Sequence, residues 1–280
     1  MRLFGLTLLT MIAFAANSVL NRVALAGELI DPASFAVIRL FSGAAVLALI
    51  VLTRSGTKPA LLTSRRAAGM AALLAYMLGF SFAYVSLDTG VGALVLFGGV
   101  QITMFAGALA LRERVPAAKW LGALIAAGGL AWFLWPAPGT GIDLAGASLM
   151  GVAALGWGIY SLLGRGARNA TAETAANFAL AAPVSLLALL AVKPHLTLPG
   201  VALAALSGIL MSGLGYALWY AILPRLAAST AAIAQLSVPI LAAIGGIVLL
   251  GEALTARFII AAIIVLGGIG LSVVAPRMRA

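Results

Sequence analysis

The chain has 280 residues, of which 64% are hydrophobic and only 9% are charged, and its mean hydropathy is +1.17. A soluble domain could not cover so much apolar surface with polar groups, so this composition excludes that class and indicates a chain that uses the lipid bilayer as its solvent. The formal net charge is +10, and the absence of cysteine excludes disulfides and thiol chemistry.

Apolar stretches of about twenty residues recur along the chain, and each is long enough to cross roughly 30 Å of hydrocarbon as a helix. The short breaks between them hold most of the charges and many of the prolines that end helices. The sequence therefore predicts an all-α, polytopic membrane protein with ten transmembrane helices. The predicted spans are 3–25, 32–53, 66–86, 90–111, 117–135, 144–164, 171–192, 199–222, 228–250 and 256–275.

The charges are distributed unevenly between alternate breaks. With the N-terminus placed inside the cell, thirteen of the seventeen basic residues fall in cytoplasmic segments, whereas five of the seven acidic residues fall outside. Orientation follows the bias of lysine and arginine, so both termini are predicted to be cytoplasmic. We interpret the basic excess as a topology signal and a contact with anionic lipid, not as a patch for nucleic acid.

One sequence pattern occurs twice. Around Glu113 the chain reads LALRERVPAAKWLGALIAAGGL, and around Glu252 it reads VLLGEALTARFIIAAIIVLGGIG; a shift of 139 positions superposes the two glutamates. Five helices per copy is an odd number, so the second copy enters the membrane from the opposite side. The pattern predicts two inverted five-helix repeats, 1–138 and 139–280, an arrangement typical of alternating-access carriers with a site near the membrane midplane.

Aromatic and small polar residues share one face of four predicted helices. In the first helix, Phe14, Asn17, Ser18 and Asn21 follow the spacing i, i+3, i+4, i+7. A belt at the lipid headgroups explains the rings at the ends of the fifth helix, but rings deeper within their spans are more typical of a cavity lining. The predicted substrate-binding residues are Asn17, Ser18, Tyr76, Phe80, Gln101, Trp157, Tyr160, Tyr216, Tyr220 and Gln235.

Three polar residues within the predicted spans have alternative interpretations. Arg39 lies about 10 Å from the outer end of the second helix, where its charge needs a partner, a cavity or a route to the surface. We favour a structural or gating role, such as bracing carbonyl groups, over direct binding of a substrate carboxylate. Gln101 and Gln235 are neutral groups that either join helices or contact a polar ligand.

Further residues are predicted to act in structure or gating. Glu113 and Glu252 each precede a predicted helix, where a carboxylate meets unsatisfied N–H groups; we favour this capping role over ion coupling. Pro183 and Pro239 lie within the seventh and ninth spans and predict kinks, and Pro239 is the better candidate for gating. The paired glycines of the fifth and tenth helices predict close packing as a scaffold or dimer face.

The twice-repeated glutamate, followed by an apolar helix that ends in Gly-Gly, resembles the EamA-type repeats of the drug/metabolite transporter superfamily. The resemblance covers nearly the whole chain and is strongest in 90–130 and 228–270. Within the superfamily the chain is most similar to the YddG-like amino-acid exporters of bacterial inner membranes. That similarity implies export of aromatic and other neutral amino acids, or their analogues, through a central cavity. Many EamA repeats carry an arginine near the position of Arg39, and the second copy lacks it.

The remaining functional expectations come from what the spans contain. No Asp, Glu or His lies in the middle of a predicted span, which favours a facilitator or exchanger over a proton antiporter. With no cysteine, one histidine and no Walker-type loop, the sequence predicts no enzyme, no metal site and no cofactor. The expected partners are a small-molecule substrate and membrane lipids, for a monomer or homodimer in a bacterial inner membrane. The alternatives are an exporter of drugs, nucleosides or other metabolites, with proton coupling left open, and a membrane scaffold or channel.

Overall fold

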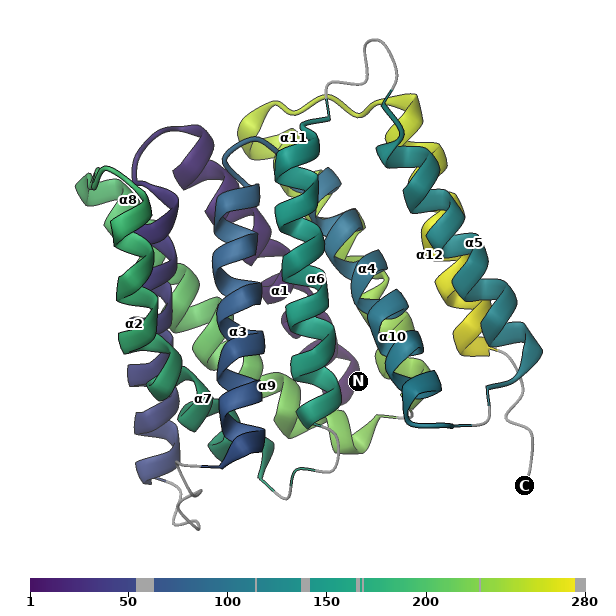
Figure 1. Cartoon of the computed structure of the whole chain (residues 1–280), viewed down its shortest axis with the longest axis horizontal. Coiled ribbons are helices and arrows are strands. Elements are labelled where there is room, and N and C mark those ends of the chain that lie inside the picture. The colour runs from purple at the N-terminus through teal and green to yellow at the C-terminus, as the bar shows by residue number, and fades with distance from the viewer. Residues whose placement is uncertain are drawn as a thin grey trace.

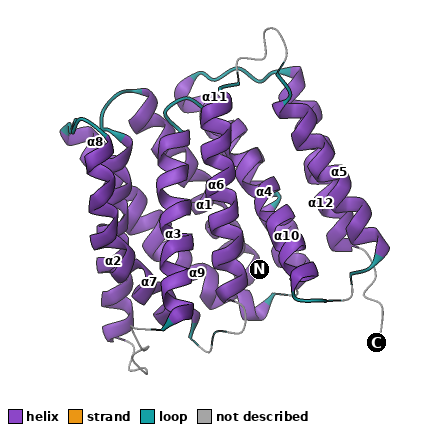
Figure 2. Cartoon of the chain, viewed as in Figure 1, coloured by secondary structure: helices purple, strands orange, loops and turns teal. Residues whose placement is uncertain are grey.

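The computed structural model describes residues 1–53, 63–113, 115–136, 142–164, 167, 169–226 and 228–274, and these residues form a bundle of membrane-length helices (Figures 1 and 2). Ten helical segments in this part of the chain are long and apolar enough to span a membrane. The helices are α1 (Arg2–Ala26), α2 (Pro32–Thr53), α3 (Ser64–Ala83), α4 (Thr89–Ala110), α5 (Ala117–Leu134), α6 (Leu144–Gly164), α7 (Ala170–Ser185), η1 (Leu186–Ala191), α8 (Leu198–Leu206), η2 (Ser207–Leu214), α9 (Gly215–Ile222), η3 (Leu223–Arg225), α10 (Ala228–Gln235), α11 (Ser237–Leu250) and α12 (Ala256–Val274).

The predicted spans agree with these helices to within a few residues, because apolar length is what decides whether a segment can cross a bilayer. Several basic residues that entered the topology prediction lie outside the described residues: Arg54, Lys58, Arg114, Arg165, Arg168, Arg277 and Arg279. The bundle has two ends. We call the one that holds the α1–α2, α3–α4 and α11–α12 connections the Glu252 end, and the opposite one, where α3 begins, the Arg66 end; they are the upper and lower ends in Figure 1.

Each of the two spans with a predicted kink is irregular close to its proline. Helix α7 gives way to the 3₁₀-helix η1 three residues after Pro183, and the ninth span is interrupted at Leu236, between α10 and α11. Proline has no N–H and its ring displaces the carbonyl four residues earlier, which explains a break just before Pro239. The eighth span contains a feature that the sequence did not predict: its middle, η2, is a π-helix.

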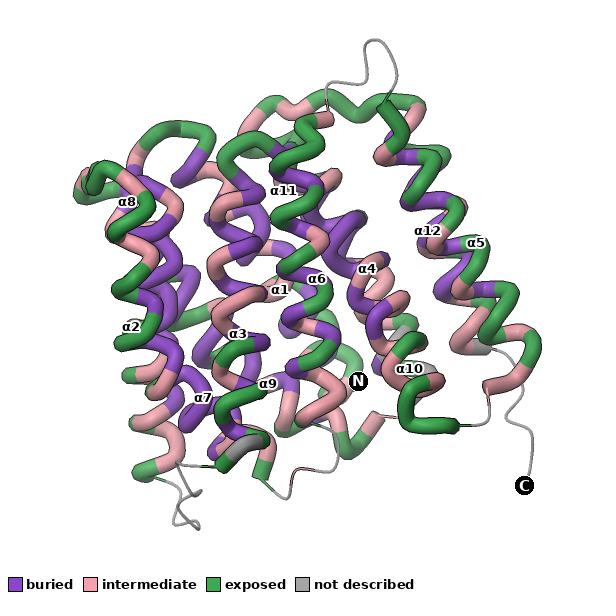
Figure 3. Tube along the Cα trace, viewed as in Figure 1, coloured by how far each residue is buried: buried purple, intermediate pink, exposed green. Residues whose placement is uncertain are grey.

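The main packing pairs each join residues 1–138 to residues 139–280. Helix α3 packs on α6, α5 on α12, α2 on α7 and η2, and α1 on α11, η2 and α9. Buried residues gather along the sides of the helices that face one another, and exposed residues lie on the outer sides (Figure 3). A core shared in this way holds the two halves of the chain together and places their contact surface at the middle of the bundle.

Loops from the two halves are joined at the Glu252 end. Ile30 and Leu196 form an antiparallel bridge, and the Asp31 carboxylate accepts hydrogen bonds from the N–H groups of Ser34 (2.8 Å) and His195 (3.0 Å). Burial alone would raise the pKa of Asp31, but the N–H groups outweigh it and lower this pKa below 3.8. The stabilisation is therefore present above that pH and is lost as the pH falls through the lowered value.

Glycines allow α5 and α12 to approach closely at one edge of the bundle. A Cβ atom on Gly122 or Gly268 would meet backbone atoms of the facing helix at 2.4 and 2.8 Å, respectively. Gly267, the neighbour of Gly268, has no atom within 4 Å of such a Cβ position. The Trp120, Trp132 and Trp135 side chains on α5 and at its end are exposed, as a headgroup belt requires, whereas Phe133 is buried against Phe258 and is a core residue rather than part of that belt.

This asymmetry within one glycine pair gives a matched test of packing. We expect Gly268→Ala to destabilise the protein by about 1–3 kcal/mol, because α5 and α12 must move apart to admit the methyl group. Gly267→Ala adds the same atom on the open side and should leave stability unchanged. Melting temperatures of the two variants in detergent measure the difference, and equal values would contradict the assigned α5–α12 contact.

Candidate functional site

A central cavity lies between helices of both halves. Its wall comprises Phe14, Asn17 and Ser18 of α1, Tyr76 and Phe80 of α3, Leu96 and Phe97 of α4, Trp157 of α6 and Tyr216 of α9. The structure thus brings together six of the residues that were predicted to bind substrate. Leu96 and Phe97 were missed, because nothing distinguishes them from core residues in the sequence.

The aromatic rings of this cavity are in contact with one another. The centroid of the Trp157 ring lies 4.9 Å from that of Tyr76 and 5.1 Å from that of Tyr216, and Phe14 meets Tyr216 edge-on at 5.8 Å. A flat ligand held between two rings needs about twice the stacking distance, or roughly 7 Å between them. The centre is therefore closed in this conformation, and a ligand with a ring must separate these side chains.

Polar contacts join α1 to both halves beside the rings. The Asn17 Oδ1 atom accepts a hydrogen bond from Ser207 Oγ of η2 at 2.6 Å, and Asn21 Oδ1 accepts one from Ser81 Oγ of α3 at 3.0 Å. Ser18 Oγ is buried and has no hydrogen-bond partner in the described part of the chain. The predicted polar stripe of α1 therefore faces the interior of the bundle and supplies both fixed contacts and one unused hydroxyl group.

Arg39 of α2 lies behind the cavity wall and is fully buried. Its Nε atom donates to Ser212 Oγ of η2 (2.9 Å), and its Nη2 atom donates to the Tyr76 hydroxyl (3.1 Å). The guanidinium carbon also lies 5.4 Å from the Tyr76 ring centroid and 5.0 Å from that of Phe80. The prediction that Arg39 braces carbonyl groups is wrong in its detail, since the described partners are two hydroxyl groups.

The Tyr76 hydroxyl connects this arginine to the other half of the chain. It accepts a hydrogen bond from the Tyr216 hydroxyl at 3.3 Å. Tyr76 and Tyr216 occupy the third and eighth spans, which correspond in the predicted repeat. A continuous contact thus runs from Ser212 through Arg39 and Tyr76 to Tyr216, and any ligand that parts the two tyrosines also disturbs the arginine.

Two predicted binding residues line a different pocket, nearer the Arg66 end. Tyr160 and Tyr220 lie there with Thr174 and Asn177 of α7, and the Tyr160 hydroxyl donates to Thr174 Oγ1 at 3.1 Å. The Arg66 Nη1 atom forms an ion pair with Glu173 at 2.7 Å at the same pocket. Tyr160 also stacks on Trp157, with ring centroids 5.6 Å apart, so the second pocket lies directly behind the wall of the central cavity.

Gln101 and Gln235 belong to neither of these two cavities. Both are half-buried, Gln101 within α4 and Gln235 as the last residue of α10. Both interpretations, a link between helices and a contact with a polar ligand, therefore stay predictions. A neutral amide at membrane depth can be recognised in the sequence, but the sequence does not tell which way its side chain points from the helix.

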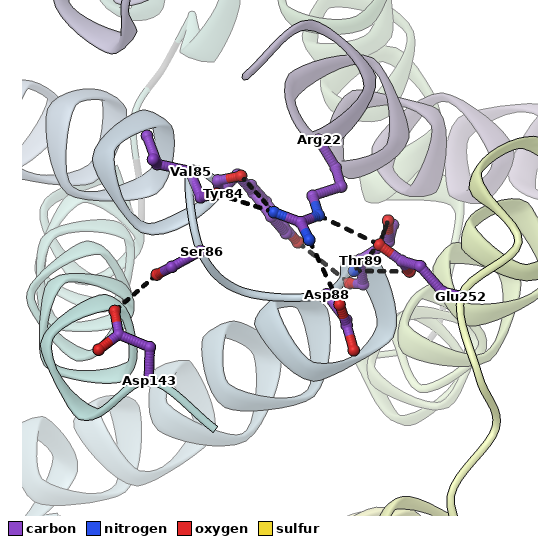
Figure 4. Close-up of polar contacts among 8 residues, drawn as sticks. All are labelled: Arg22, Tyr84, Val85, Ser86, Asp88, Thr89, Asp143 and Glu252. Atoms are coloured by element: carbon purple, nitrogen blue, oxygen red, sulfur yellow. Dashed lines mark hydrogen bonds and ion pairs between the residues drawn. The ribbon is translucent and has the colours of Figure 1, made fainter. Parts of the chain in front are cut away.

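The prediction that Glu252 caps the helix that follows it is wrong, because its carboxylate caps α4 instead. Its carboxylate accepts from the Thr89 N–H at 2.9 and 3.0 Å and from the Thr89 hydroxyl at 3.1 Å (Figure 4). The Arg22 Nε atom of α1 approaches the same carboxylate at 3.2 Å, and Arg22 also donates to the Tyr84 and Val85 carbonyls. Gly251, with φ of 67°, ends α11 in the left-handed conformation that turns the chain toward this contact.

The carboxylates around this site differ in exposure. Asp88 pairs with the Arg22 Nη2 atom at 3.4 Å but is half-exposed, and Asp143 accepts from Ser86 Oγ at 2.6 Å (Figure 4). The Ser86 hydroxyl and the Gly146 N–H together lower the pKa of Asp143. At the opposite end of the bundle, Glu113 lies exposed in the loop before α5, and its capping role stays a prediction. The Glu252 carboxylate, of which 10% is exposed, is therefore the main charged link between the described parts of the two halves at this end.

Comparison with known proteins gives the chain a family. Residues 144–274 match the EamA-like transporter family, and an uncharacterized protein of Pseudomonas aeruginosa is 48% identical over 275 residues, which cover 98% of this chain and 94% of that protein. A solved crystal structure has the same fold, with a TM-score of 0.64 and 22% identity over 94% of this chain and 96% of that chain. The chain therefore belongs to the EamA-like transporter family and is a multi-pass membrane transporter of the drug/metabolite type.

Proposed function

We propose that this transporter exports aromatic and other neutral amino acids, and related metabolites, by alternating access through the central cavity. The observation that carries the proposal is the cluster of Tyr76, Trp157, Tyr216 and Phe14 around one cavity between the halves of the chain. Rings in this arrangement offer flat apolar faces to an aromatic or aliphatic side chain. The substrate crosses chemically unchanged, so the protein is no enzyme in this proposal.

The mechanism rests on the division into inverted repeats of residues 1–138 and 139–280. In such a protein each half takes the conformation of the other when the cavity changes sides. The bonded loops and the Glu252 contact then close the Glu252 end in the present conformation. We place the Glu252 end outside the cell and both termini in the cytoplasm of a bacterium, with the protein in the inner membrane, on the bias of the basic residues.

Counterflow in proteoliposomes tests the substrate class. We expect vesicles loaded with unlabelled L-phenylalanine to take up labelled L-phenylalanine transiently, and a panel of neutral amino acids to compete with it. Empty vesicles and vesicles that hold a denatured sample are the controls. Competition by nucleosides or cationic drugs in place of amino acids would indicate an exporter of drugs, nucleosides or other metabolites. A lack of saturable counterflow would instead favour a scaffold or channel.

The proposed energy source is the substrate gradient alone. The lining of the central cavity contains no Asp, Glu or His, and proton relays in membranes use such groups. We expect a pH gradient of one unit across the vesicle membrane to leave the final level of L-phenylalanine unchanged. Accumulation above equilibrium that depends on the imposed gradient would show proton coupling and overturn this part of the proposal.

A further inference from the structure

Arg39 is a buried cation without a counter-charge. None of its atoms is exposed to solvent, and no carboxylate lies within ion-pair distance of it among the described residues. An unpaired charge at membrane depth is costly, even when hydroxyl groups and ring faces surround it. An anionic ligand beside Arg39 would reduce this cost, because it would supply the missing counter-charge.

The hydrogen bonds of Arg39 are also incomplete. A guanidinium group has five N–H donors, and the described contacts use the Nε atom, toward Ser212, and the Nη2 atom, toward Tyr76. The Nη1 atom is buried and has no hydrogen-bond partner among the residues that the structure describes. The Nη1 and Nη2 atoms form the edge of a guanidinium group that pairs with both oxygens of a carboxylate, and one half of this edge is unused here.

The unused edge lies next to the central cavity. The guanidinium group lies over the rings of Tyr76 and Phe80, which are both part of the cavity wall, and the Tyr76 hydroxyl holds its Nη2 atom. That hydroxyl is held in turn by Tyr216 from the opposite half. When a ligand separates Tyr76 from Tyr216, the Tyr76 ring no longer shields Arg39 from the cavity. Arg39 then also loses the Tyr76 hydroxyl as a hydrogen-bond acceptor.

We propose that Arg39 binds the carboxylate group of the substrate, which inserts between the tyrosine hydroxyls and takes the place of Tyr76 on the Nη1–Nη2 edge. This inference rests on the proposed function and names the chemical class that the site selects: a small molecule with one carboxylate and an apolar or aromatic body. One carboxylate supplies the two acceptor oxygens that one guanidinium edge can pair with, and it neutralises the charge of Arg39. The unpartnered Ser18 Oγ in the same cavity wall offers an acceptor to the amino group of such a substrate.

Compounds that differ in one group test the inference on the unmodified protein. L-Phenylalanine, L-phenylalaninamide and 2-phenylethylamine share the ring and the amino group, but only the first has a carboxylate; 3-phenylpropionate keeps the carboxylate and lacks the amino group. We expect the two compounds without a carboxylate to inhibit counterflow at least about tenfold less well than L-phenylalanine, because each loses hydrogen bonds to a buried charge. We expect 3-phenylpropionate to retain competition. Equal inhibition by L-phenylalanine and L-phenylalaninamide would overturn the inference and leave the proposed function intact.

Variants and a binding measurement complete the test. In Arg39→Gln, L-phenylalanine should lose its advantage over the amide, and Arg39→Lys should restore part of it, since an ammonium keeps the charge but not the paired N–H groups. Arg257→Gln, on α12 at the edge of the bundle, is the control arginine and should keep the full preference. If Arg39→Gln does not fold, the compound series on the unmodified protein decides. Thermal stabilisation of the purified protein by L-phenylalanine but not by its amide gives a readout that is independent of transport; stabilisation by neither compound would overturn the inference together with the proposed function.

Discussion

Trp157→Ala is expected to lower the rate of L-phenylalanine counterflow more than any other replacement in the cavity wall. The indole ring lines the central cavity and touches Tyr76, Tyr216 and Tyr160, so it contacts rings of both halves of the chain and a residue that lines the second pocket. An aromatic contact contributes about 0.5–1.5 kcal/mol. In Trp157→Ala a substrate ring would lose one such contact, and the cavity wall would no longer fit the ring. We expect a loss of about 2 kcal/mol in binding, or roughly thirtyfold in the concentration that gives half-maximal transport.

The control for this replacement is Trp132→Ala. Trp132 is 44% exposed at the edge of the bundle and packs against Arg257 rather than the cavity. Both variants should insert and give a single peak in gel filtration, and only Trp157→Ala should change the half-saturating concentration. If Trp157→Ala transports like the unmodified protein, the ring serves helix packing and the substrate lies elsewhere.

Glu252→Ala is expected to open the Glu252 end of the bundle. The replacement removes a carboxylate that is 10% exposed, together with its bonds to Arg22 and to the first turn of α4. Breaking a buried ion pair by removing one partner costs about 3 kcal/mol, and here that cost falls on the closed conformation. An equilibrium shifted by that amount changes the open fraction by roughly a hundredfold until the open state dominates.

Thiol labelling measures this shift, because the chain has no cysteine of its own. A single cysteine at Leu96, in the cavity wall, should react at least about tenfold faster with an impermeant reagent added at the Glu252 end when Glu252→Ala is also present. Asp88→Ala is the matched control, since Asp88 contacts the same arginine from a half-exposed position and its loss should change the rate by a few-fold at most. Equal labelling in all three backgrounds would contradict a closing role for Glu252.

The sequence was sufficient for the helices and for much of the cavity wall. Apolar length alone places a span in the membrane, and the spacing of Asn17 and Ser18 defines a face whatever lies opposite. What the sequence could not provide was the identity of the partners across the bundle. Ser212 reaches Arg39 from η2, whose π-helical turn has no signature in the residue pattern, and Glu252 caps α4 because two distant loops meet.

The two glutamines show that the sequence also predicts cavity residues that do not line the cavity. Gln101 and Gln235 carried as strong a polar signal as Asn17, yet only Asn17 lies in the cavity wall. A small rotation of a helix about its axis decides between the two outcomes, and packing sets that rotation. Polar type and depth within a span therefore do not place a residue in the cavity wall by themselves, because packing against the facing helix decides which way the side chain points.

The most direct test of alternating access is the sidedness of labelling at Leu96→Cys without any other change. The cysteine is exposed to an impermeant thiol reagent in right-side-out and in inside-out vesicles, with and without L-phenylalanine. We predict that the reagent reaches it from both sides, in separate experiments, and that L-phenylalanine slows both reactions. Labelling from one side only, unaffected by L-phenylalanine, would contradict a cavity that opens in turn to each side of the membrane.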